Sequence, residues 1–293
     1  MIPYFKIDAL ELFGPLAIQP WGVLVALGFI LGTMVCRRYA APRGLDPDAY
    51  ADLIVWIALG GLVFGHLGHA FFYQWDHYSK NPLELFKVWD GLSSYGGYIG
   101  CTLVAFAFFK RRKLDVLKFG DITMVGLAFG IFVGRLGCFV VHDHIGVEVR
   151  DTPQIVQTLF GWLAIEFPPG TAEAGRSSLR FDGGLLESVN GLVTFGVLVF
   201  LARKPRFPGM LLGAAPIVYG INRFFNDFAR HSDLATADNH WGPFTPAQWF
   251  SCVLVLVGTS LLIANRKKPV WPDGTEVPWD EQVAAKSKAP AAP

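Results

Sequence analysis

The chain has few charged residues. Asp, Glu, Lys and Arg make up 17% of its 293 residues, whereas soluble domains contain about 25%. Hydrophobic residues make up 52%, and they gather in long runs that are rich in Gly and Phe. This composition excludes an ordinary soluble domain and is typical of a polytopic membrane protein. We expect no nucleic acid among its partners.

Cysteine is scarce as well. All four cysteines lie in or at the ends of apolar runs, where thiols are mostly small packing residues. They are Cys36, Cys101, Cys138 and Cys252. We therefore expect no disulfide framework. No basic segment with a small-residue cleavage site precedes the first apolar run, so no cleaved signal peptide is expected.

Seven segments are predicted to be transmembrane helices, which need about 20 mainly apolar residues each. They are residues 21–37, 50–73, 95–109, 119–141, 183–201, 210–228 and 244–264. The predicted fold is therefore an all-α polytopic membrane domain of seven helices over residues 1–268. Residues 1–20 and 81–91 are amphipathic and aromatic, and we expect them to lie on the membrane surface as two arms.

Basic residues fix the predicted orientation. Lys and Arg cluster after the first, third, fifth and seventh segments, so these four loops share one side, which is the cytoplasmic side. The clusters are Arg37, Arg38 and Arg43; Lys110, Arg111, Arg112, Lys113 and Lys118; Arg203, Lys204 and Arg206; and Arg266, Lys267 and Lys268. The N-terminus is then periplasmic, and residues 142–182 form a small periplasmic head with one or two short strands. Residues 269–293, rich in Pro, Ala and charge, are predicted to be a disordered cytoplasmic tail.

Charged residues inside the apolar segments indicate the candidate site. An arginine within a membrane costs about 2.5–3.5 kcal/mol, so it needs a partner and usually has a role. Arg135 lies near the outer end of the fourth segment, and Arg223 and Asp227 lie near the outer end of the sixth. Glu187 lies just inside the outer boundary of the fifth. Polar residues of separate helices thus share one level of the bilayer, where we expect an anionic lipid headgroup to bind.

Histidines are predicted at the same level. His66 and His69 lie in the outer half of the second segment, and His142, Asp143 and His144 follow the fourth. Together they could form a metal site, but hydrogen-bonded structural histidines or headgroup contacts are favoured. We predict no metal and no cofactor.

Purely structural roles remain open for several of these polar residues and for two of their neighbours. Arg223 and Asp227 are four residues apart, which fits an ion pair on one helix face. Arg135 could extend its side chain to the interface. Tyr95 could belong to an interfacial aromatic belt, and Cys138 could be a packing residue.

In four segments the chain resembles the phosphatidylglycerol–prolipoprotein diacylglyceryl transferase family. Residues 88–100, 134–146, 203–206 and 219–227 carry the resemblance, in the order of the family. It implies transfer of a diacylglyceryl group from phosphatidylglycerol to the lipobox cysteine thiol of a prolipoprotein. Phosphatidylglycerol and the prolipoprotein signal peptide are then the partners, in the bacterial cytoplasmic (inner) membrane with the active site towards the periplasm.

The polar residues placed at one level and the resemblance together give the candidate site residues. The catalytic candidates are Arg135, Arg223, Tyr95, His142, Asp143, His144 and Asp227. The substrate-binding candidates are Gly96, Gly97, Gly134, Gly137, Cys138, Gly146, Tyr219, Glu187, His66 and His69. The family usually has histidine at Tyr95, asparagine at Cys138, and glutamate at Asp143 and Asp227, so the arginines are kept while the residues that handle protons differ.

The acceptor thiol must lose a proton before it attacks, since its pKa is about 8.5. Our hypothesis is that His142 or His144, steered by Asp143, is the base. Three other functions remain open: a paralogue that uses another acceptor, a non-catalytic lipid- or lipoprotein-binding membrane protein, and a metal-dependent membrane hydrolase.

Overall fold

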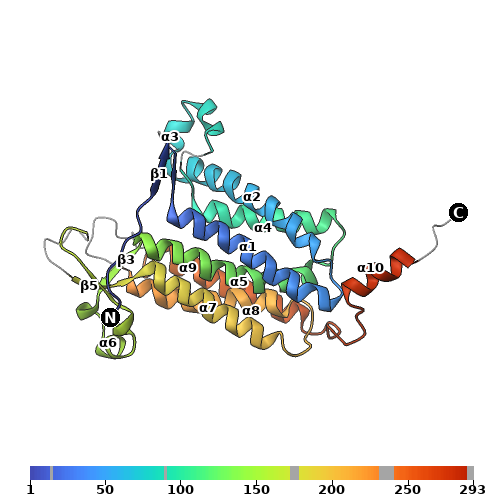
Figure 1. The fold of residues 1–293 in the computed structure, drawn as a ribbon. Coiled ribbons are helices and arrows are strands. Elements are labelled where there is room, and N and C mark those ends of the chain that lie inside the picture. The colour runs from blue at the N-terminus through green and yellow to red at the C-terminus, as the bar shows by residue number, and fades with distance from the viewer. Residues whose placement is uncertain (14–15, 89–90, 172–177, 231–240, 289–293) are drawn as a thin grey trace. The chain divides into compact units, whose positions relative to one another are not determined.

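The computed structural model describes residues 1–13, 16–88, 91–171, 178–230 and 241–288, and these residues are mostly helical (Figure 1). One long helix corresponds to each of the seven predicted segments. These helices are α1 (Pro20–Ala40), α2 (Asp48–Tyr73), α4 (Ser94–Arg111), α5 (Val116–Val141), α7 (Gly183–Leu201), α8 (Met210–Asn226) and α9 (Pro246–Asn265).

Five of these helices are long and apolar enough to cross a membrane: α1, α2, α5, α7 and α9. Helices α4 and α8 do not reach that standard, and they contain 18 and 17 residues. The chain is therefore a multi-pass membrane protein. Seven spans and their orientation stay predictions.

Short elements connect the long helices. They are β1 (Leu10–Phe13), β2 (Leu16–Ile18), η1 (Ala41–Arg43), α3 (Trp75–Tyr78), η2 (Pro82–Phe86), β3 (Ile145–Glu148), η3 (Val149–Asp151), α6 (Gln154–Phe160), η4 (Gly161–Leu163), β4 (Ile165–Phe167), β5 (Ser178–Asp182), η5 (Asp227–Ala229) and α10 (Trp279–Lys288). Strands β1 and β2 pair antiparallel, and β3, β5 and β4 form an antiparallel sheet in that order. The sequence predicted one or two short strands within residues 142–182, where the structure has three, and it did not predict the strands β1 and β2, because strands of three to five residues leave little periodicity in a sequence.

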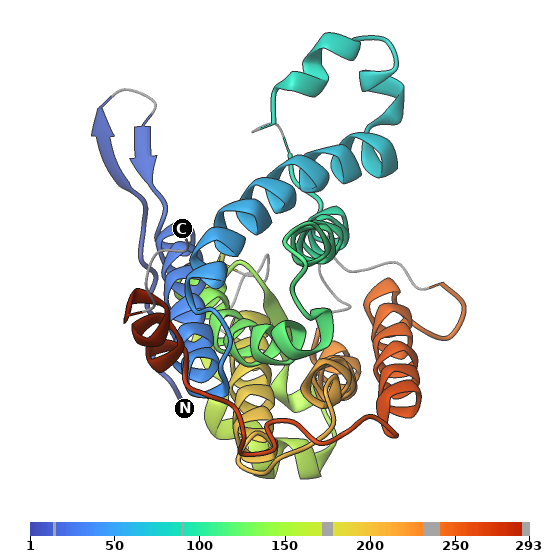
Figure 2. The same ribbon diagram turned by 90° about the vertical axis from the view of Figure 1, so that its right-hand side faces the viewer.

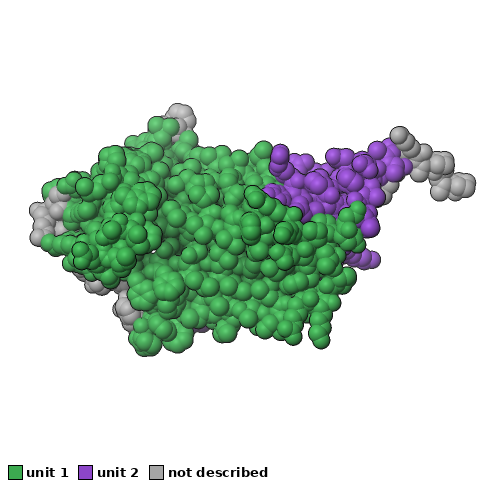
Figure 3. All heavy atoms as spheres, turned by 90° about the horizontal axis from the view of Figure 1, so that it is seen from below, with its two compact units in different colours: residues 1–35, 121–274 green, residues 36–120, 275–293 purple. Residues whose placement is uncertain are grey.

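The chain divides into two compact units, which Figure 3 colours separately. Unit 1 comprises Met1–Val35 and Asp121–Gly274, and unit 2 comprises Cys36–Gly120 and Thr275–Pro293. The boundaries fall inside α1 and α5. Every candidate residue from Arg135 to Asp227 belongs to unit 1.

Glycines set the close packing of the helices in unit 1. A Cβ on Gly28 of α1 would lie 2.6 Å from the carbonyl oxygen of Gly130 on α5, and one on Gly191 of α7 would lie 2.7 Å from the nitrogen of Phe132. Helices α8 and α9 lie side by side (Figure 2) and are equally close at Gly258. Small residues permit such approach between membrane helices, and it brings α5, α7 and α8 within side-chain reach of one another.

A buried carboxylate fixes the start of α8 against α5. Asp121 on α5 accepts hydrogen bonds from the backbone nitrogens of Gly209, at 2.8 Å, and Leu212, at 2.7 Å. An anion is favoured at a helix N-terminus, where backbone N–H groups lack partners within the helix. Asp121 thus caps a helix that begins 89 residues later, at Met210.

Unit 2 contains α2 and α4, which also cross at glycines, with a Cβ on Gly68 only 2.8 Å from the Cα of Gly96. The tail predicted to be disordered contains regular structure within its described part, residues 269–288, and residues 289–293 lie outside the described structure. Residues Trp279–Lys288 form α10, where Gln282 donates a hydrogen bond to the carbonyl of Gly44 at 3.2 Å. In unit 1, Trp271 is buried and pairs with Arg206. Composition alone suggested disorder, but these contacts give the tail a partner surface.

Candidate functional site

Glu187 joins the two arginines that the sequence singled out. Arg135 comes from α5, Glu187 from α7 and Arg223 from α8. Nε of Arg135 lies 3.9 Å from Oε2 of Glu187, and Nε of Arg223 lies 2.7 Å from Oε1 of the same carboxylate. Two guanidinium groups from different helices are therefore held by one carboxylate.

Asp227 extends this group towards α9. Arg223 donates through Nη1 to Oδ1 of Asp227 at 2.8 Å, the i,i+4 pair that the spacing predicts. Thr245, the residue before α9, donates its hydroxyl hydrogen to Oδ2 of Asp227. Nη1 of Arg230 lies 4.0 Å from Oδ1 of Asp227. We call Arg135, Glu187, Arg223 and Asp227 the arginine cluster.

Neutral side chains orient the carboxylate of Glu187. The hydroxyl of Tyr219 donates to Oε2 of Glu187 at 2.9 Å. Asn190 on α7 reaches the carbonyl of Tyr219 at 3.4 Å, and Asn226 on α8 donates to the carbonyl of Leu186 at 3.2 Å. These hydrogen bonds connect α7 to α8 on both sides of Glu187, so its position is set by both helices.

The carboxylate side chains of the arginine cluster are buried, whereas its arginine side chains are partly exposed. The side chains of Glu187 and Asp227 are 7% and 0% exposed, whereas those of Arg223 and Arg135 are 15% and 24% exposed. A guanidinium group has five N–H donors in a planar fork that matches the oxygens of a phosphate. The geometry therefore fits the binding of a phosphate group.

His142 has a structural environment. Nδ1 lies 2.9 Å from Oδ2 of Asp182, and Nε2 lies 2.5 Å from the carbonyl oxygen of Phe5. Each ring nitrogen therefore lies within hydrogen-bond distance of an oxygen atom of unit 1. His142 also has a φ of 53° at the end of α5, and this left-handed conformation persists because its side chain is held on both sides.

Asp143 and His144 form a separate pair at the surface of the head. Nδ1 of His144 lies 3.2 Å from Oδ2 of Asp143, with side chains that are 35% and 65% exposed respectively. The neighbouring His144 holds the pKa of the Asp143 carboxyl below its ordinary value, and the positive charge of Arg135 acts in the same direction. Asp143 therefore associates with His144, as the hypothesis requires, and not with His142.

Cys138 and the glycines near it lie close to Arg135 or to neighbouring backbone. Nη1 of Arg135 lies 3.8 Å from Sγ of Cys138. Cβ positions on Gly134 and Gly137 would contact Val25 and Trp21 of α1, and one on Gly146 would lie 2.6 Å from the carbonyl oxygen of Ala229. These glycines have packing contacts, and their assignment to the substrate stays a prediction.

The remaining candidates belong to unit 2. His66 is buried, and its Nδ1 lies 3.2 Å from the carbonyl oxygen of Gly91, while Nε2 has no hydrogen-bond partner among the described residues. His69 stacks on Tyr73. Tyr95 is half-buried in the first turn of α4. The other two candidates are Gly96 and Gly97, and their Cβ positions would approach the carbonyl oxygens of Phe64 and Gly61.

Among the residues described in the structure, no group of three or more His, Cys, Asp or Glu side chains could hold a metal ion. His66 and His69 face Gly91 and Tyr73, whereas His142 faces Asp182.

Sequence reasoning missed Asp182 and Thr245. Asp182 pairs with His142 and also caps α7, accepting a hydrogen bond from the nitrogen of Leu185 at 2.9 Å. Thr245 begins α9 in a capping box with Gln248. Both caps have a sequence signal, an Asp before a helical run and a Thr three residues before Gln. The contacts of Asp182 with His142 and of Thr245 with Asp227 join residues far apart in sequence, and they leave no such signal.

Comparison with known proteins shows which family the sequence matches. A family model described as prolipoprotein diacylglyceryl transferase matches residues 8–264. A protein of Chromohalobacter salexigens is 30% identical over 272 residues, which cover 92% of this chain and 97% of that protein. A protein of Geobacter sulfurreducens is 31% identical, covering 88% and 95% of the two chains. Both relatives are named phosphatidylglycerol–prolipoprotein diacylglyceryl transferase.

Proposed function

Because the chain belongs to the prolipoprotein diacylglyceryl transferase family, we propose that it transfers the diacylglyceryl group of phosphatidylglycerol to the lipobox cysteine of a prolipoprotein. This reaction is the first step of lipoprotein maturation. The observation that supports it most strongly is the pair of partly exposed guanidinium groups held by Glu187.

The chemistry requires such a pair. The thiolate of the lipobox cysteine attacks the terminal glyceryl carbon of the diacylglyceryl group. A C–S bond forms, the C–O bond to phosphate breaks, and glycerol 1-phosphate leaves with the electron pair. Negative charge increases on the phosphate as the bond breaks. Arg135 and Arg223 would bind its oxygens and stabilise that charge in a site of low dielectric constant.

Glu187 and Asp227 would position the arginines. Glu187 contacts both guanidinium groups, and Asp227 contacts Arg223 alone. The side chains of both carboxylates are at least nine-tenths buried, whereas the arginine side chains are partly exposed. A preorganised cation pair needs little rearrangement when the leaving group develops its charge.

The thiol proton needs an acceptor. We assign it to His144, whose Nδ1 lies beside Asp143. His142 would instead be structural, because both of its nitrogens are engaged. In this scheme Tyr95, which stands where the family usually has histidine, contacts substrate without acting as the base.

The proposal includes the membrane arrangement. Residues 1–268 would form a seven-helix domain in the bacterial cytoplasmic membrane, with residues 142–182 as a periplasmic head and the site on the periplasmic side. The arginine cluster lies near the end of α5 that leads into the head, near the C-terminal end of α8 and at the start of α7. The basic clusters lie at the opposite ends of these helices or beyond, as the proposed orientation requires.

The decisive assay uses purified protein in detergent with phosphatidylglycerol and a lipobox peptide. We expect a thioether-linked diacylglyceryl peptide and one glycerol 1-phosphate per product, measured by mass spectrometry. A peptide with serine in place of the lipobox cysteine should give no product. Release of glycerol phosphate without peptide modification would instead support another acceptor, and no turnover of bound phosphatidylglycerol would support a non-catalytic lipid-binding protein.

A further inference from the structure

Two basic segments of unit 1 meet at the ends of α7 and α8 that are opposite to the arginine cluster. One segment follows α7 and the other follows α9. Their exposed cations, which we call the basic patch, are Arg203, Lys204, Arg206, Arg266, Lys267 and Lys268. We propose that the basic patch binds the headgroup of an anionic phospholipid in the adjacent leaflet, which is the cytoplasmic leaflet in the proposed orientation. This second lipid site is separate from the site of the diacylglyceryl donor.

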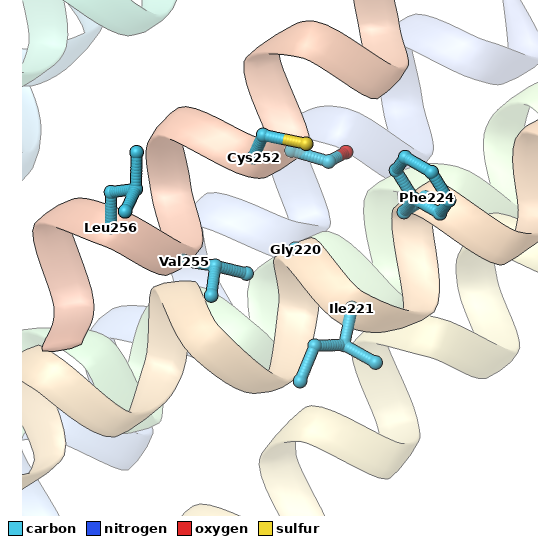
Figure 4. A pocket seen from close by; sticks show the side chains of 7 residues that line it. Gly220, Ile221, Phe224, Cys252, Val255 and Leu256 are labelled. Carbon is cyan, nitrogen blue, oxygen red and sulfur yellow. The ribbon is translucent and has the colours of Figure 1, made fainter. Parts of the chain in front are cut away.

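Helix packing places the two segments at the same end of unit 1. Helix α8 packs on α9 beside the apolar pocket of Figure 4, where a Cβ on Gly220 would lie 3.0 Å from the carbonyl oxygen of Ser251. Nearer the basic patch, a Cβ on Gly213 would lie 2.7 Å from the side chain of Leu262. The start of α8 therefore lies against the end of α9, so the segment that precedes α8 is next to the segment that follows α9.

A backbone bridge then joins the two segments. Beyond α9 the chain turns back past the connection between α7 and α8 (Figure 2). The backbone nitrogen of Arg206 donates to the carbonyl of Trp271 at 3.2 Å, and the nitrogen of Trp271 donates to the carbonyl of Arg206 at 2.6 Å. Trp271 is buried, so the returning chain is fixed in place. The cations of both segments are thus held on one surface.

The basic patch lacks a counter-charge within the described residues of the chain, where none of its six side chains forms an ion pair. The basic segments of unit 2 are different. Arg37 pairs with Asp48 at 2.9 Å, and Arg112 pairs with Asp52 at 2.6 Å. Because like charges that are held close together repel one another, an anion from outside the chain would stabilise the basic patch.

Helix termini and membrane topology explain only part of the patch. The dipole of a helix favours cations within its last turn, which accounts for Arg266 directly after α9 but not for Lys268, three residues beyond its end at Asn265. The positive-inside rule explains why cations stand on this side of the membrane. It does not explain why a backbone bridge brings the cations of two segments together.

The position of the basic patch favours a lipid over a soluble anion. Helices α7 and α9 are both long and apolar enough to cross a membrane, and the patch begins within two residues of their ends, at Arg203 and Arg266. Groups of about four to eight Lys and Arg residues beside a transmembrane helix are typical of anionic-lipid sites. The guanidinium fork of arginine matches the phosphate oxygens of such a headgroup.

The basic patch is too far from the arginine cluster to share one headgroup with it. From Met210 to Arg223, α8 advances by roughly 20 Å. Substitutions in the basic patch should therefore change lipid binding at this end of unit 1 and leave the transfer reaction unchanged.

Acetylation of lysines gives a direct test on the full-length protein in detergent. The probe is phosphatidylserine, which is anionic but is not the proposed donor, and phosphatidylcholine with the same acyl chains is the control lipid. At a phosphatidylserine concentration about four times the dissociation constant, acetylation of Lys204, Lys267 and Lys268 should slow about fivefold, because only the unoccupied fifth of the protein reacts. Peptide mass spectrometry measures the rates. Lys6 and Lys80, which are also exposed, should react equally with either lipid.

Two variants that each remove four positive charges give an independent readout. The patch variant combines Arg203→Gln, Lys204→Gln, Lys267→Gln and Lys268→Gln. The control variant combines Arg37→Gln, Arg43→Gln, Lys110→Gln and Arg112→Gln, whose cations contact carboxylates, a carbonyl or aromatic rings of unit 2. The patch variant should raise the dissociation constant for phosphatidylserine at least about tenfold, and the control variant should change it less than about twofold. Native mass spectrometry measures both constants, and transfer by the patch variant should stay at the wild-type rate.

Three results would overturn the proposal. Equal weakening by the two variants would show that only the overall charge matters, and equal protection of the lysines by phosphatidylserine and phosphatidylcholine would exclude headgroup selection. Protection of the same lysines by inorganic phosphate or a short RNA at the concentration of phosphatidylserine used would assign the patch to a soluble anion. Protection is measured without an acceptor peptide, so its outcome does not depend on the proposed function, which the transfer assay tests separately.

Discussion

Unit 1 contains two clusters of charged side chains that differ in how far their side chains are exposed. In the arginine cluster, the guanidinium groups of Arg135 and Arg223 keep partial exposure. The head contains a second cluster, which we call the head network. Its members are His142, Glu148, Arg180 and Asp182, and their side chains are at most 9% exposed.

The head network is complete in itself. Arg180 donates through Nε to Ser178 at 3.1 Å, through Nη1 to the carbonyl of Gly146 at 3.0 Å, and through Nη2 to Glu148 at 3.3 Å. Its donors are directed at atoms of the head, so little remains for a ligand. Buried charge alone therefore does not mark a binding site in this protein; partly exposed donors beside buried acceptors do.

The two clusters meet at α7. Asp182 of the head network caps α7 through the nitrogen of Leu185, and Glu187 follows within the first turns of the same helix. The head would thus place the start of α7, and α7 places the carboxylate that holds both arginines. Substitutions in the head should act on stability, and substitutions in the arginine cluster should act on turnover.

The largest expected effect is on stability, in the head. Arg180→Met removes the buried cation beside Glu148 and leaves only the exposed Arg150 next to that carboxylate, and we expect a loss of about 3–5 kcal/mol of folding free energy. Thermal denaturation in detergent measures it. Arg150→Met is the control, since Arg150 is 59% exposed and such ion pairs contribute about 0–1 kcal/mol. Equal loss for both variants would contradict a sealed head network.

The next largest effects should distinguish His144, which we assign to proton transfer, from His142, which we assign to the fold. His144→Gln should lower kcat by about 10²-fold, the lower end for loss of a general base. His142→Asn should lower the denaturation temperature while the folded protein keeps most of its kcat, because asparagine tolerates the left-handed backbone. If His142→Asn abolishes turnover without loss of stability, the roles of the two residues must be exchanged.

Within the arginine cluster, Glu187→Gln should affect turnover more than folding. The amide keeps the shape and can accept the hydrogen bond of Tyr219, but it removes the charge between the guanidinium groups. A hydrogen bond to a charged group contributes about 1.5–3 kcal/mol, so kcat/KM should fall about 10–100-fold. Glu166→Gln, on an exposed position of β4, should leave kcat/KM unchanged.

The smallest effect concerns pH. The pKa of Asp143 is lowered by His144, so this pair stabilises the fold above the ordinary Asp value of about 4 and loses that contribution as the pH falls below it. The side chain of Asp143 is 65% exposed, and the contribution is therefore at most about 1 kcal/mol. Asp143→Asn should differ from wild type in thermal stability at pH 7, and the difference should shrink as the pH falls below 4. If the difference in thermal stability grows towards low pH, it would contradict a stabilising role for ionised Asp143.

Local signals in the sequence were enough to predict the long helices and one ion pair of the candidate site. The apolar runs predicted each long helix, and the four-residue spacing predicted the ion pair of Arg223 and Asp227. Contacts between residues distant in sequence could not be predicted. Glu187 is 52 residues from Arg135, and Asp182 is 40 residues from His142. A single sequence does not state which helices are neighbours, so the bridging position of Glu187 and the engagement of His142 emerged only from the packing of α5, α7 and β5.

Replacement of each arginine by lysine tests the central claim most directly. Lysine keeps the positive charge but loses the planar fork that would hold two phosphate oxygens. Glycerol 1-phosphate release from phosphatidylglycerol, with lipobox peptide as acceptor, should fall about 10²–10³-fold in kcat for both Arg135→Lys and Arg223→Lys, while Arg150→Lys stays at the wild-type rate. Wild-type release by either variant would show that its guanidinium group does not hold the departing phosphate.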